Sequence, residues 1–296
     1  MKKVLLLLGI FAFSHLHAQD SDTTYWKKAF VGSLSFNQAS FSDNWKAGGV
    51  NSLGLNALLN YRANYLKGRH SWDNEIDLLF GFINTGKQGY RKNNDRIYLD
   101  TKYGYALGPK WNMFGALNIL TQFTRGYRYE TDSLDREVEL LISDFMAPGF
   151  FTASWGFEYV PKPFFKVRLS PLAPRLTVVR NQDLYVNVEN NYGVEIGKTT
   201  RWEWLAFQLL ADFNKDLSEN VNLNFRYMMF ANYETLELNK IDHRLDANLT
   251  VKFAKYFNMN LTAIMLYDYD QDGDIQFSQA LGIGVIYTKK NYTDKE

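Results

Sequence analysis

The sequence predicts an all-β protein, folded as a transmembrane antiparallel up-and-down β-barrel of about 12 strands with short periplasmic turns and long extracellular loops. Three observations predict this fold. Apolar and polar residues alternate over segments longer than most soluble strands, short and long connections alternate along the chain, and large aromatic residues lie beside the short connections. After the N-terminus no run approaches the roughly 18 apolar residues of a membrane helix, so a chain that spans the bilayer must do so as a closed sheet.

The first element is an export signal. Two lysines precede an apolar stretch, Val4–Phe13, that is too short to span a bilayer, and Ala18 supplies a small residue for cleavage. We expect residues 1–18 to be a cleaved signal peptide and residues 19–296 to form a single barrel domain. An uncleaved anchor is the alternative. The chain has no cysteine, so lipid attachment at a cysteine, disulfides and thiol chemistry are excluded.

The strands are predicted from period-two alternation. In residues 53–65 one face is apolar or aromatic at seven successive positions, while the other face is mostly polar. A tilted membrane strand needs about 9–11 residues, which this segment supplies. Equally clear strands are predicted at 72–84, 221–231, 243–253 and 258–267. Noisier strands are predicted at 29–40, 96–107, 111–124, 149–160, 164–172, 201–213 and 276–288.

The connections between these strands alternate in length. Tight joints occur at 67–69, 108–110, 161–163, 216–220 and 255–256. Longer connections occur at 41–49, 85–95, 125–148, 173–200, 232–241 and 268–275. Such alternation is typical of the periplasmic and extracellular ends of outer-membrane barrels. It predicts an even strand number with both termini on the periplasmic side, and the apolar content of loop 125–148 makes that loop the best candidate for a partner contact or a plug.

Large aromatic residues share the outward parity next to the short joints, where a membrane girdle is expected. The predicted girdle consists of Tyr65, Trp72, Trp111, Tyr159, Phe213, Phe253 and Tyr287.

Charged residues of both signs occupy the opposite, lumen-facing parity. They are Arg62, Asp73, Glu75, Asp77, Asp100, Lys102, Arg168, Asp212, Arg226, Arg244, Asp246 and Lys252. At this strand number the interior lies between filled small barrels and open porins. We favour a network of ion pairs that fills or constricts the lumen. A small polar pathway is the alternative.

Four short segments carry a family resemblance. Asn44–Asn51, Leu169–Leu172, Phe230–Tyr233 and Leu266–Asp268 follow one another in an order that resembles an uncharacterised outer-membrane β-barrel family of the Bacteroidota, catalogued only as a domain of unknown function. The resemblance covers nearly the whole mature chain. It implies the same barrel and the same location, and it implies no activity and no catalytic residues.

The acidic segment at 268–274 matches the first half of a calcium loop. Asp268, Asp270, Asp272 and Asp274 follow the spacing D-x-D-x-D-G, in which alternate carboxylates converge on one cation. The twelfth loop position is Gln279 rather than a bidentate glutamate, and the flanking segments are predicted strands. A plain acidic hairpin loop is therefore the favoured alternative. We expect no other cofactor.

The remaining predictions concern location, partners and function. The predicted barrel places the protein in the cell outer membrane. Removing Lys2 and Lys3 from the 33 basic residues leaves 31 against 32 acidic residues, which does not suit a nucleic-acid partner. We expect no enzymatic activity. The expected partners are outer-membrane lipids and a protein bound through the extracellular loops, in a structural or interaction role, as a subunit of a larger assembly. A narrow channel or transporter for small hydrophilic or amphipathic solutes is the alternative. A rim hydrolase built on Asp242 and His243 ranks third.

Overall fold

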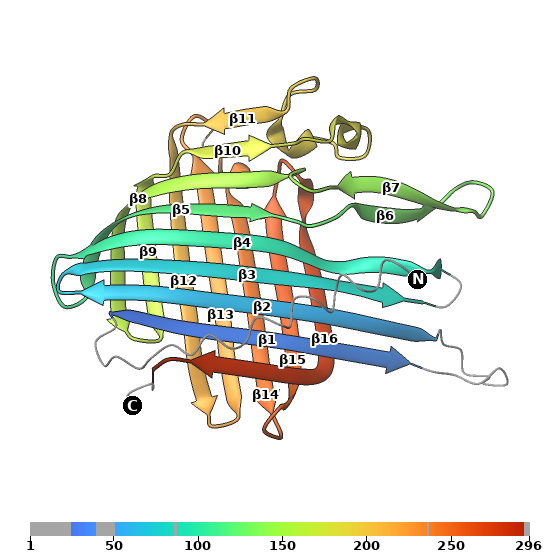
Figure 1. The fold of residues 1–296 in the computed structure, drawn as a ribbon. Coiled ribbons are helices and arrows are strands. Elements are labelled where there is room, and N and C mark those ends of the chain that lie inside the picture. Colours follow the sequence, from blue (N-terminus) through green and yellow to red (C-terminus); the bar gives the residue numbers. More distant parts are fainter. Residues whose placement is uncertain (1–24, 40–50, 86–87, 236, 293–296) are drawn as a thin grey trace, which may run out of the picture.

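The computed structural model describes residues 25–39, 51–85, 88–235 and 237–292 (Figure 1). The predicted signal peptide lies outside the described residues. The first eight strands are β1 (Trp26–Ala39), β2 (Ser52–Lys67), β3 (His70–Asn84), β4 (Tyr90–Ala106), β5 (Trp111–Thr121), β6 (Gly126–Thr131), β7 (Glu137–Ser143) and β8 (Gly149–Lys162). The others are β9 (Phe165–Leu172), β10 (Arg175–Val178), β11 (Thr200–Glu203), β12 (Ala206–Ser218), β13 (Val221–Asn232), β14 (Asp242–Lys252), β15 (Phe257–Asp268) and β16 (Asp272–Lys290).

Fourteen of the described strands form one antiparallel sheet that closes on itself. Its order is β11-β10-β8-β5-β4-β3-β2-β1-β16-β15-β14-β13-β12-β9, and an additional pairing of β9 with β8 closes the sheet. Strand β10 continues β9, and β12 continues β11. Backbone hydrogen bonds from Ala153 to Pro174 and from Ala173 to Ala206 carry the ladder across the break between the two pairs. Counted in this way the wall has 12 strands, which confirms the predicted barrel.

The barrel has an inverted pattern of burial that follows from the alternation along each strand. Outward-facing Phe36 and Ile283 are 54% and 52% exposed, whereas Lys102 and Glu158 on the lumen side are each 2% exposed. A water-soluble barrel would bury the first pair and expose the second. An apolar outer wall around a polar interior is the arrangement of an outer-membrane barrel. Among the described residues no helix is long and apolar enough to cross a membrane.

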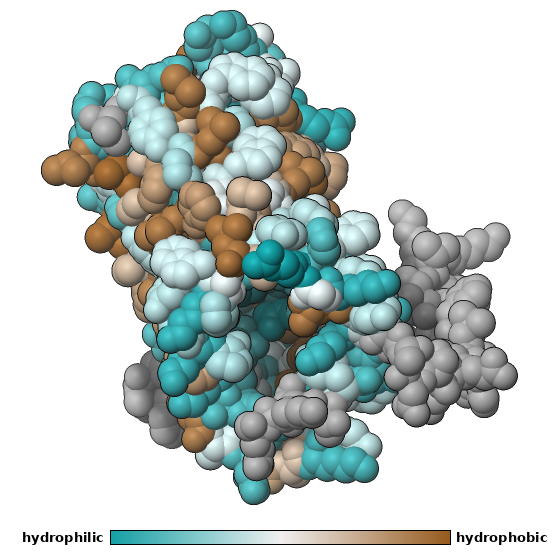
Figure 2. Space-filling view, turned by 90° about the vertical axis from the view of Figure 1, so that its left-hand side faces the viewer, coloured by the Kyte–Doolittle hydropathy of each residue, from teal (hydrophilic) through white to brown (hydrophobic). Residues whose placement is uncertain are grey.

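Figure 2 looks onto the left-hand side of Figure 1, toward the edge where the β2–β3 and β4–β5 turns lie. Hydrophobic residues gather over the upper part of this face. Below them a hollow opens, and the visible surface within it is hydrophilic. The picture agrees with a polar interior enclosed by an apolar wall.

The structure corrects the sequence prediction at two long connections. Residues 125–148 were expected to be one loop, but they contain the β6–β7 hairpin, which projects beyond the barrel wall (Figure 1). The connection expected at 173–200 contains β10 and two 3-10 helices, Gln182–Val186 and Asn191–Gly193. A third short helix lies at Leu238–Lys240. These elements are short, and their apolar residues pack between loops rather than along one face, so no periodic signal marks them.

Strand β16 bends and so forms a corner in the barrel wall. Its first part pairs with β15, and its last part, from Ile283 to Lys290, pairs with β1. Figure 1 shows the strand turning sharply between these two contacts. The lumen-facing residues Gln276 and Ser278 on its first part are exposed to solvent. The outward-facing Phe277 beside them is exposed as well, so this part of β16 lies at the solvent-exposed rim of the barrel.

Candidate functional site in the barrel lumen

The two longest-range ion pairs of the lumen join opposite walls. Arg96 on β4 lies 2.6 Å from Asp246 on β14, and Arg226 on β13 lies 2.6 Å from Glu75 on β3. Each pair joins strands six steps apart in the closed sheet, which is the largest separation that 12 strands allow. The two bridges therefore cross the full width of the barrel.

Each residue of the two bridges also pairs with a charged residue on its own side of the barrel. Arg96 also pairs with Asp77 at 2.5 Å, and Asp246 also accepts from Arg244 at 2.7 Å. In the second bridge Glu75 pairs with Arg62 at 3.0 Å, and Arg226 pairs with Asp212 at 2.7 Å. Eight charges thus form two continuous chains across the lumen. We call these two chains the ionic plug.

A third ionic cluster fills the lumen beside β8 and β9. Lys102 lies 2.5 Å from Glu158 and 3.0 Å from Asp73, while Arg168 lies 2.9 Å from Asp100 and 3.5 Å from Glu158. Lys102, Glu158, Arg168 and Asp100 are all buried. Buried charges persist only when they are paired, and here each one faces an opposite charge.

The structure therefore brings together all but one of the predicted lumen charges. Lys252 is the exception, since it has no ion-pair partner among the described residues. Sequence reasoning missed Arg96, Glu158 and Lys166, which lies 3.9 Å from Asp212. Glu158 precedes the outward-facing Tyr159, so strict parity would have found it. Arg96 shares the parity of Asp100 and Lys102 on β4, so the same rule would have found it too.

A further cluster, also missed, lies near the long-loop end. Arg175 pairs with Glu203 and with Asp242 at 2.7 Å each, and Arg201 pairs with Asp270 at 2.6 Å. Arg175, Arg201 and Glu203 belong to the short strands β10 and β11. Strand β10 falls within the connection expected at 173–200, so no lumen parity was assigned to Arg175. Arg201 and Glu203 fall at the start of the noisier strand predicted at 201–213, where they were not singled out.

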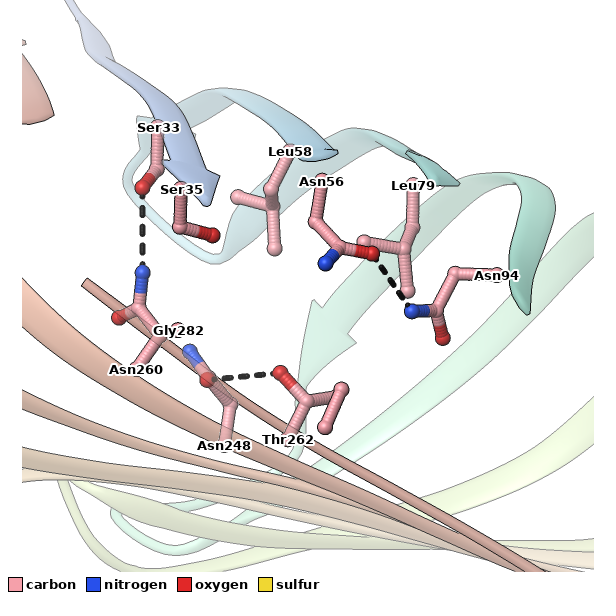
Figure 3. A pocket seen from close by; sticks show the side chains of 11 residues that line it. Ser33, Ser35, Asn56, Leu58, Leu79, Asn94, Asn248, Asn260, Thr262 and Gly282 are labelled. Carbon is pink, nitrogen blue, oxygen red and sulfur yellow. Dashed lines mark hydrogen bonds between the residues drawn. The ribbon is translucent and has the colours of Figure 1, made fainter. Parts of the chain in front are cut away.

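Beside the ionic plug lies a cavity lined by uncharged residues, which we call the neutral compartment (Figure 3). Its volume is about 30 Å³. Its lining consists of Ser33, Ser35, Asn56, Leu58, Leu79, Asn94, Asn248, Asn260, Thr262, Ala280 and Gly282.

Hydrogen bonds join the polar residues of the neutral compartment in pairs. Asn260 donates to Ser33 at 3.1 Å, Asn94 donates to Asn56 at 2.8 Å, and Thr262 donates to Asn248 at 3.3 Å (Figure 3). Asn94 and Asn248 each lie two positions along their strands from a member of the Arg96–Asp246 bridge. The ionic plug and the neutral compartment are therefore neighbouring sectors of one lumen.

The four aspartates of the predicted calcium loop do not converge. Asp268 accepts hydrogen bonds from the backbone of Asp270 and the side chain of Gln271, while Asp270 pairs with Arg201. The Asp272 side chain accepts from the backbone of Asp274. Within the described ranges no group of three or more acidic, histidine or cysteine side chains is placed to hold a metal ion. Calcium binding at this loop stays an untested hypothesis.

The residues of the hydrolase alternative face opposite sides of β14. Asp242 pairs with Arg175 in the lumen, whereas the Nδ1 atom of His243 lies 2.7 Å from the hydroxyl of Tyr227. Successive residues of a strand point to opposite faces, so the two side chains do not form a carboxylate–histidine pair.

The long loops build a small apolar core of their own. Ala147, Val179, Leu184, Val188, Tyr192 and Val194 are buried together, with Leu141 and Ile142 packed against them. We call this cluster the loop core. The Tyr192 hydroxyl donates to the carbonyl of Ile142, and burial raises its pKa above the usual value. Part of the apolar content predicted for loop 125–148 is therefore used within the protein.

Asp144 ties the loop core to its surroundings. Its carboxylate accepts from Asn181 at 3.1 Å, from the backbone of Phe145 at 2.8 Å and from Arg125 at 3.3 Å. Partial burial opposes ionisation, but these hydrogen bonds and the charge of Arg125 outweigh it and lower the pKa of Asp144.

The predicted girdle residues lie beside the short turns, several of them in aromatic pairs. Trp111 and Tyr159 have ring centroids 4.8 Å apart, and Phe213 and Phe225 stack at 4.9 Å. Trp72, Trp111, Phe253 and Tyr287 are exposed, while Tyr65, Tyr159 and Phe213 are partly buried. Their role as membrane anchors stays a prediction.

Solved structures resemble the chain at low sequence identity. The translocator domain of the autotransporter NalP from Neisseria meningitidis has a TM-score of 0.36 at 12% identity, with 90% of each chain covered. An outer membrane channel from Pseudomonas putida F1 has a TM-score of 0.40 at 8% identity, covering 92% of this chain and 97% of that one. The NanC porin has a TM-score of 0.40 at 8% identity, covering 86% and 98%. No curated protein matches the chain.

One family model matches the chain, over a shorter stretch than the resemblance noted from the sequence. Of the four motifs, only Asn44–Asn51 falls within the matched stretch. That segment lies almost wholly outside the described residues. Residues 36–127 match the family described as "Protein of unknown function (DUF3078)", and this confirms the resemblance to a family of unknown function.

Proposed function

We propose that this outer-membrane barrel is closed to ions and serves a structural or interaction role, as a subunit of a larger outer-membrane assembly that it contacts through its long loops. The observation that carries the proposal is the ionic plug. Arg96 and Arg226 each join opposite walls, so the charges that a porin would expose to permeating ions are paired with one another.

The long-loop end offers a surface for such a contact. The loop core gives this end a fixed shape, and several apolar side chains remain outside it. Tyr185, Val186 and Ile196 are exposed beside the buried Leu184 and Val194. Exposed apolar residues carried on an ordered scaffold are typical of protein contact sites.

Native gel electrophoresis of gently solubilised outer membranes tests the interaction role. We expect the wild-type chain to migrate in a complex larger than the monomer. A variant in which a short Gly-Ser linker replaces residues 127–142 should migrate as the monomer, because the linker removes Leu141 and Ile142 from the loop core. Arg128→Ala, on the exposed face of the same hairpin, is the matched control. Migration of the wild-type chain as a monomer would contradict the proposal.

A narrow channel is the second candidate, and the neutral compartment favours it. Small lumen residues such as Ala280 and Gly282 leave space there that the ionic plug does not fill. Release of a small uncharged solute from loaded proteoliposomes separates the two functions. If the barrel is closed, the solute should leave the proteoliposomes no faster than it leaves loaded vesicles without protein. Rapid release from vesicles that contain the wild-type chain would favour the channel.

A further inference from the structure

We propose that the short-turn end of the barrel binds anionic phospholipids of the periplasmic leaflet, through a ring of exposed cations that meets their phosphate groups. This inference goes beyond the proposed function, which concerns the long-loop end, so either can fail without the other. Each of the five short turns between described strands carries or adjoins an exposed lysine or arginine, and we call this set the basic rim. Its members are Lys67, Arg69, Lys110, Lys162, Lys215 and Lys255.

Few acidic residues accompany the basic rim. Within four residues of the five short turns the sequence holds three acids, Asp73, Asp216 and Glu219. Asp73 pairs with Lys102 in the lumen, and the other two both belong to the turn between β12 and β13. Within the described ranges no ion pair involves a member of the basic rim. The rim therefore presents positive charge that the protein itself does not neutralise.

The long-loop end treats its cations differently. Most of the exposed cations there pair with an acid in the same loop, at 2.7–2.9 Å. These pairs are Arg128–Glu130, Arg136–Asp132, Lys198–Glu195 and Lys240–Glu237. Unpaired positive charge on the surface is therefore found mainly at the short-turn end.

Aromatic rings hold members of the basic rim at the level of the predicted girdle. The Nζ atom of Lys67 lies 4.8 Å from the centre of the Tyr25 ring, and that ring packs edge-on against the girdle residue Tyr65. Three further contacts of this kind are Arg69 over Tyr105, Lys215 over Phe164 and Lys255 over Tyr256. Aromatic girdles lie at the headgroup level of a membrane, so these cations lie where lipid phosphates are expected.

Lysine and arginine at this level suit an anionic lipid. Their carbon stems can lie along apolar surface while the charged group reaches the headgroups. Both side chains bind phosphate oxygens through charge-assisted hydrogen bonds. A zwitterionic headgroup brings its own cation, which offsets the attraction of its phosphate. The basic rim should therefore prefer phospholipids of net negative charge.

The distribution of the cations around the barrel favours lipids over a single soluble partner. The turns β2–β3 and β12–β13 lie on opposite sides of the closed sheet, and both belong to the same end of the barrel (Figure 1). Strands β1 and β16 lie between them and add the exposed residues Lys27, Lys28 and Lys289. One bound molecule would contact one side of this ring, whereas membrane lipids surround it.

Native mass spectrometry of the refolded full chain in a non-ionic detergent tests the proposal. The chain is mixed with equal amounts of phosphatidylglycerol and phosphatidylcholine that carry the same acyl chains. We expect the retained phosphatidylglycerol to exceed phosphatidylcholine at least about fivefold, the attraction that one cation near the membrane surface supplies. Equal retention, in a sample whose heat-modifiable mobility shows a folded barrel, would overturn the proposal and leave a soluble anionic molecule as the partner of the rim.

A triple variant localises the binding. Lys67→Gln/Arg69→Gln/Lys110→Gln removes half of the basic rim, from the turns β2–β3 and β4–β5. All three side chains are exposed, so the barrel should still fold. The excess of phosphatidylglycerol should fall about twofold, because the cations act nearly independently at the surface. An unchanged excess in the folded variant would overturn the assignment to the basic rim.

Two matched controls separate position from net charge and charge from side-chain shape. Arg128→Gln/Arg136→Gln/Lys198→Gln removes the same charge from the long-loop end and should keep the wild-type excess. Lys67→Arg/Lys110→Arg keeps the charge of the rim and should also keep it. An equal fall in the two triple variants would assign the preference to the net charge of the whole protein and overturn the proposal.

Discussion

The guanidinium of Arg96 holds two carboxylates at once, Asp77 on the neighbouring strand and Asp246 on the opposite wall. An arginine can do this because its planar fork presents several N–H donors in fixed directions. Arg96 therefore connects two opposite walls of the barrel across the lumen. On one side of it the lumen is ionic, and on the other side it is lined by amides and hydroxyls.

The ion pairs that cross the lumen should stabilise the folded barrel. Replacement in Arg226→Ala would leave Glu75 and Asp212 facing each other's charge with less compensation, and side chains this buried are poorly screened by water. We expect a loss of about 3–5 kcal/mol in the free energy of unfolding, measured by urea titration in lipid vesicles. Arg128→Ala, which breaks an exposed pair with Glu130, should cost less than about 1 kcal/mol. A similar loss of unfolding free energy in the two variants would contradict a stabilising role of the ion pairs that cross the lumen.

The membrane-facing wall makes a parity prediction. Leu249 and Asn248 are neighbours on β14 and therefore point to opposite faces of the wall. Asn248 lines the neutral compartment, so Leu249 faces outward. Leu249→Arg would place a cation in the lipid, at a cost of about 2–4 kcal/mol near the bilayer midplane. Asn248→Arg should be milder, because the lumen is polar. Equal folding yields for the two variants would contradict the assignment of faces.

Acidic conditions should loosen the loop core. The lowered pKa of Asp144 means that its ionised form is favoured by folding. Its contribution is therefore complete above the ordinary pKa of about 3.9 and is lost as the pH falls through the lower folded value. Hydrogen exchange of residues 179–194, corrected for the intrinsic effect of pH, should speed up in acid more than exchange of the barrel strands. The effect should shrink in Asp144→Asn, and an equal acid response in that variant would assign it to another group.

Calcium should not bind at the acidic hairpin. Asp270 is already paired with Arg201, and the Asp268 carboxylate is bonded to Gln271, so neither is free to converge on a cation. Titration calorimetry of the wild-type chain against the double variant Asp270→Asn/Asp272→Asn should give the same heats. A saturable heat seen only in the wild-type protein would revive the calcium loop.

The sequence predicted the barrel well because one face of each strand had to be apolar. Strands β2, β13, β14 and β15 keep one parity apolar or aromatic over almost their whole length, so both their position and their facing could be inferred from residue type alone. The same parity identified the lumen charges. It could not show which charges meet, because partners such as Arg226 and Glu75 are 151 residues apart and are joined only by closure of the sheet.

The neutral compartment escaped sequence reasoning for a related reason. Asparagine, serine and threonine are common on any solvent-facing strand, so their presence carries little signal. Their role depends on Gly54 and Gly81 standing opposite Asn37 and Asn56 in the next strand, a register that appears only in the folded sheet. The loop core escaped for a similar reason, since Leu141 and Tyr192 meet only when the two connections pack against each other in the folded protein.

Single-channel recording in planar bilayers tests the central claim most directly, with the refolded wild-type chain and the double variant Arg96→Ala/Arg226→Ala side by side. The ionic plug predicts a silent wild-type protein and steady conductance steps in the variant, because the variant loses both arginines that cross the lumen. Steady steps of equal size in the two proteins would show that ions pass elsewhere in the barrel and would contradict the closed lumen.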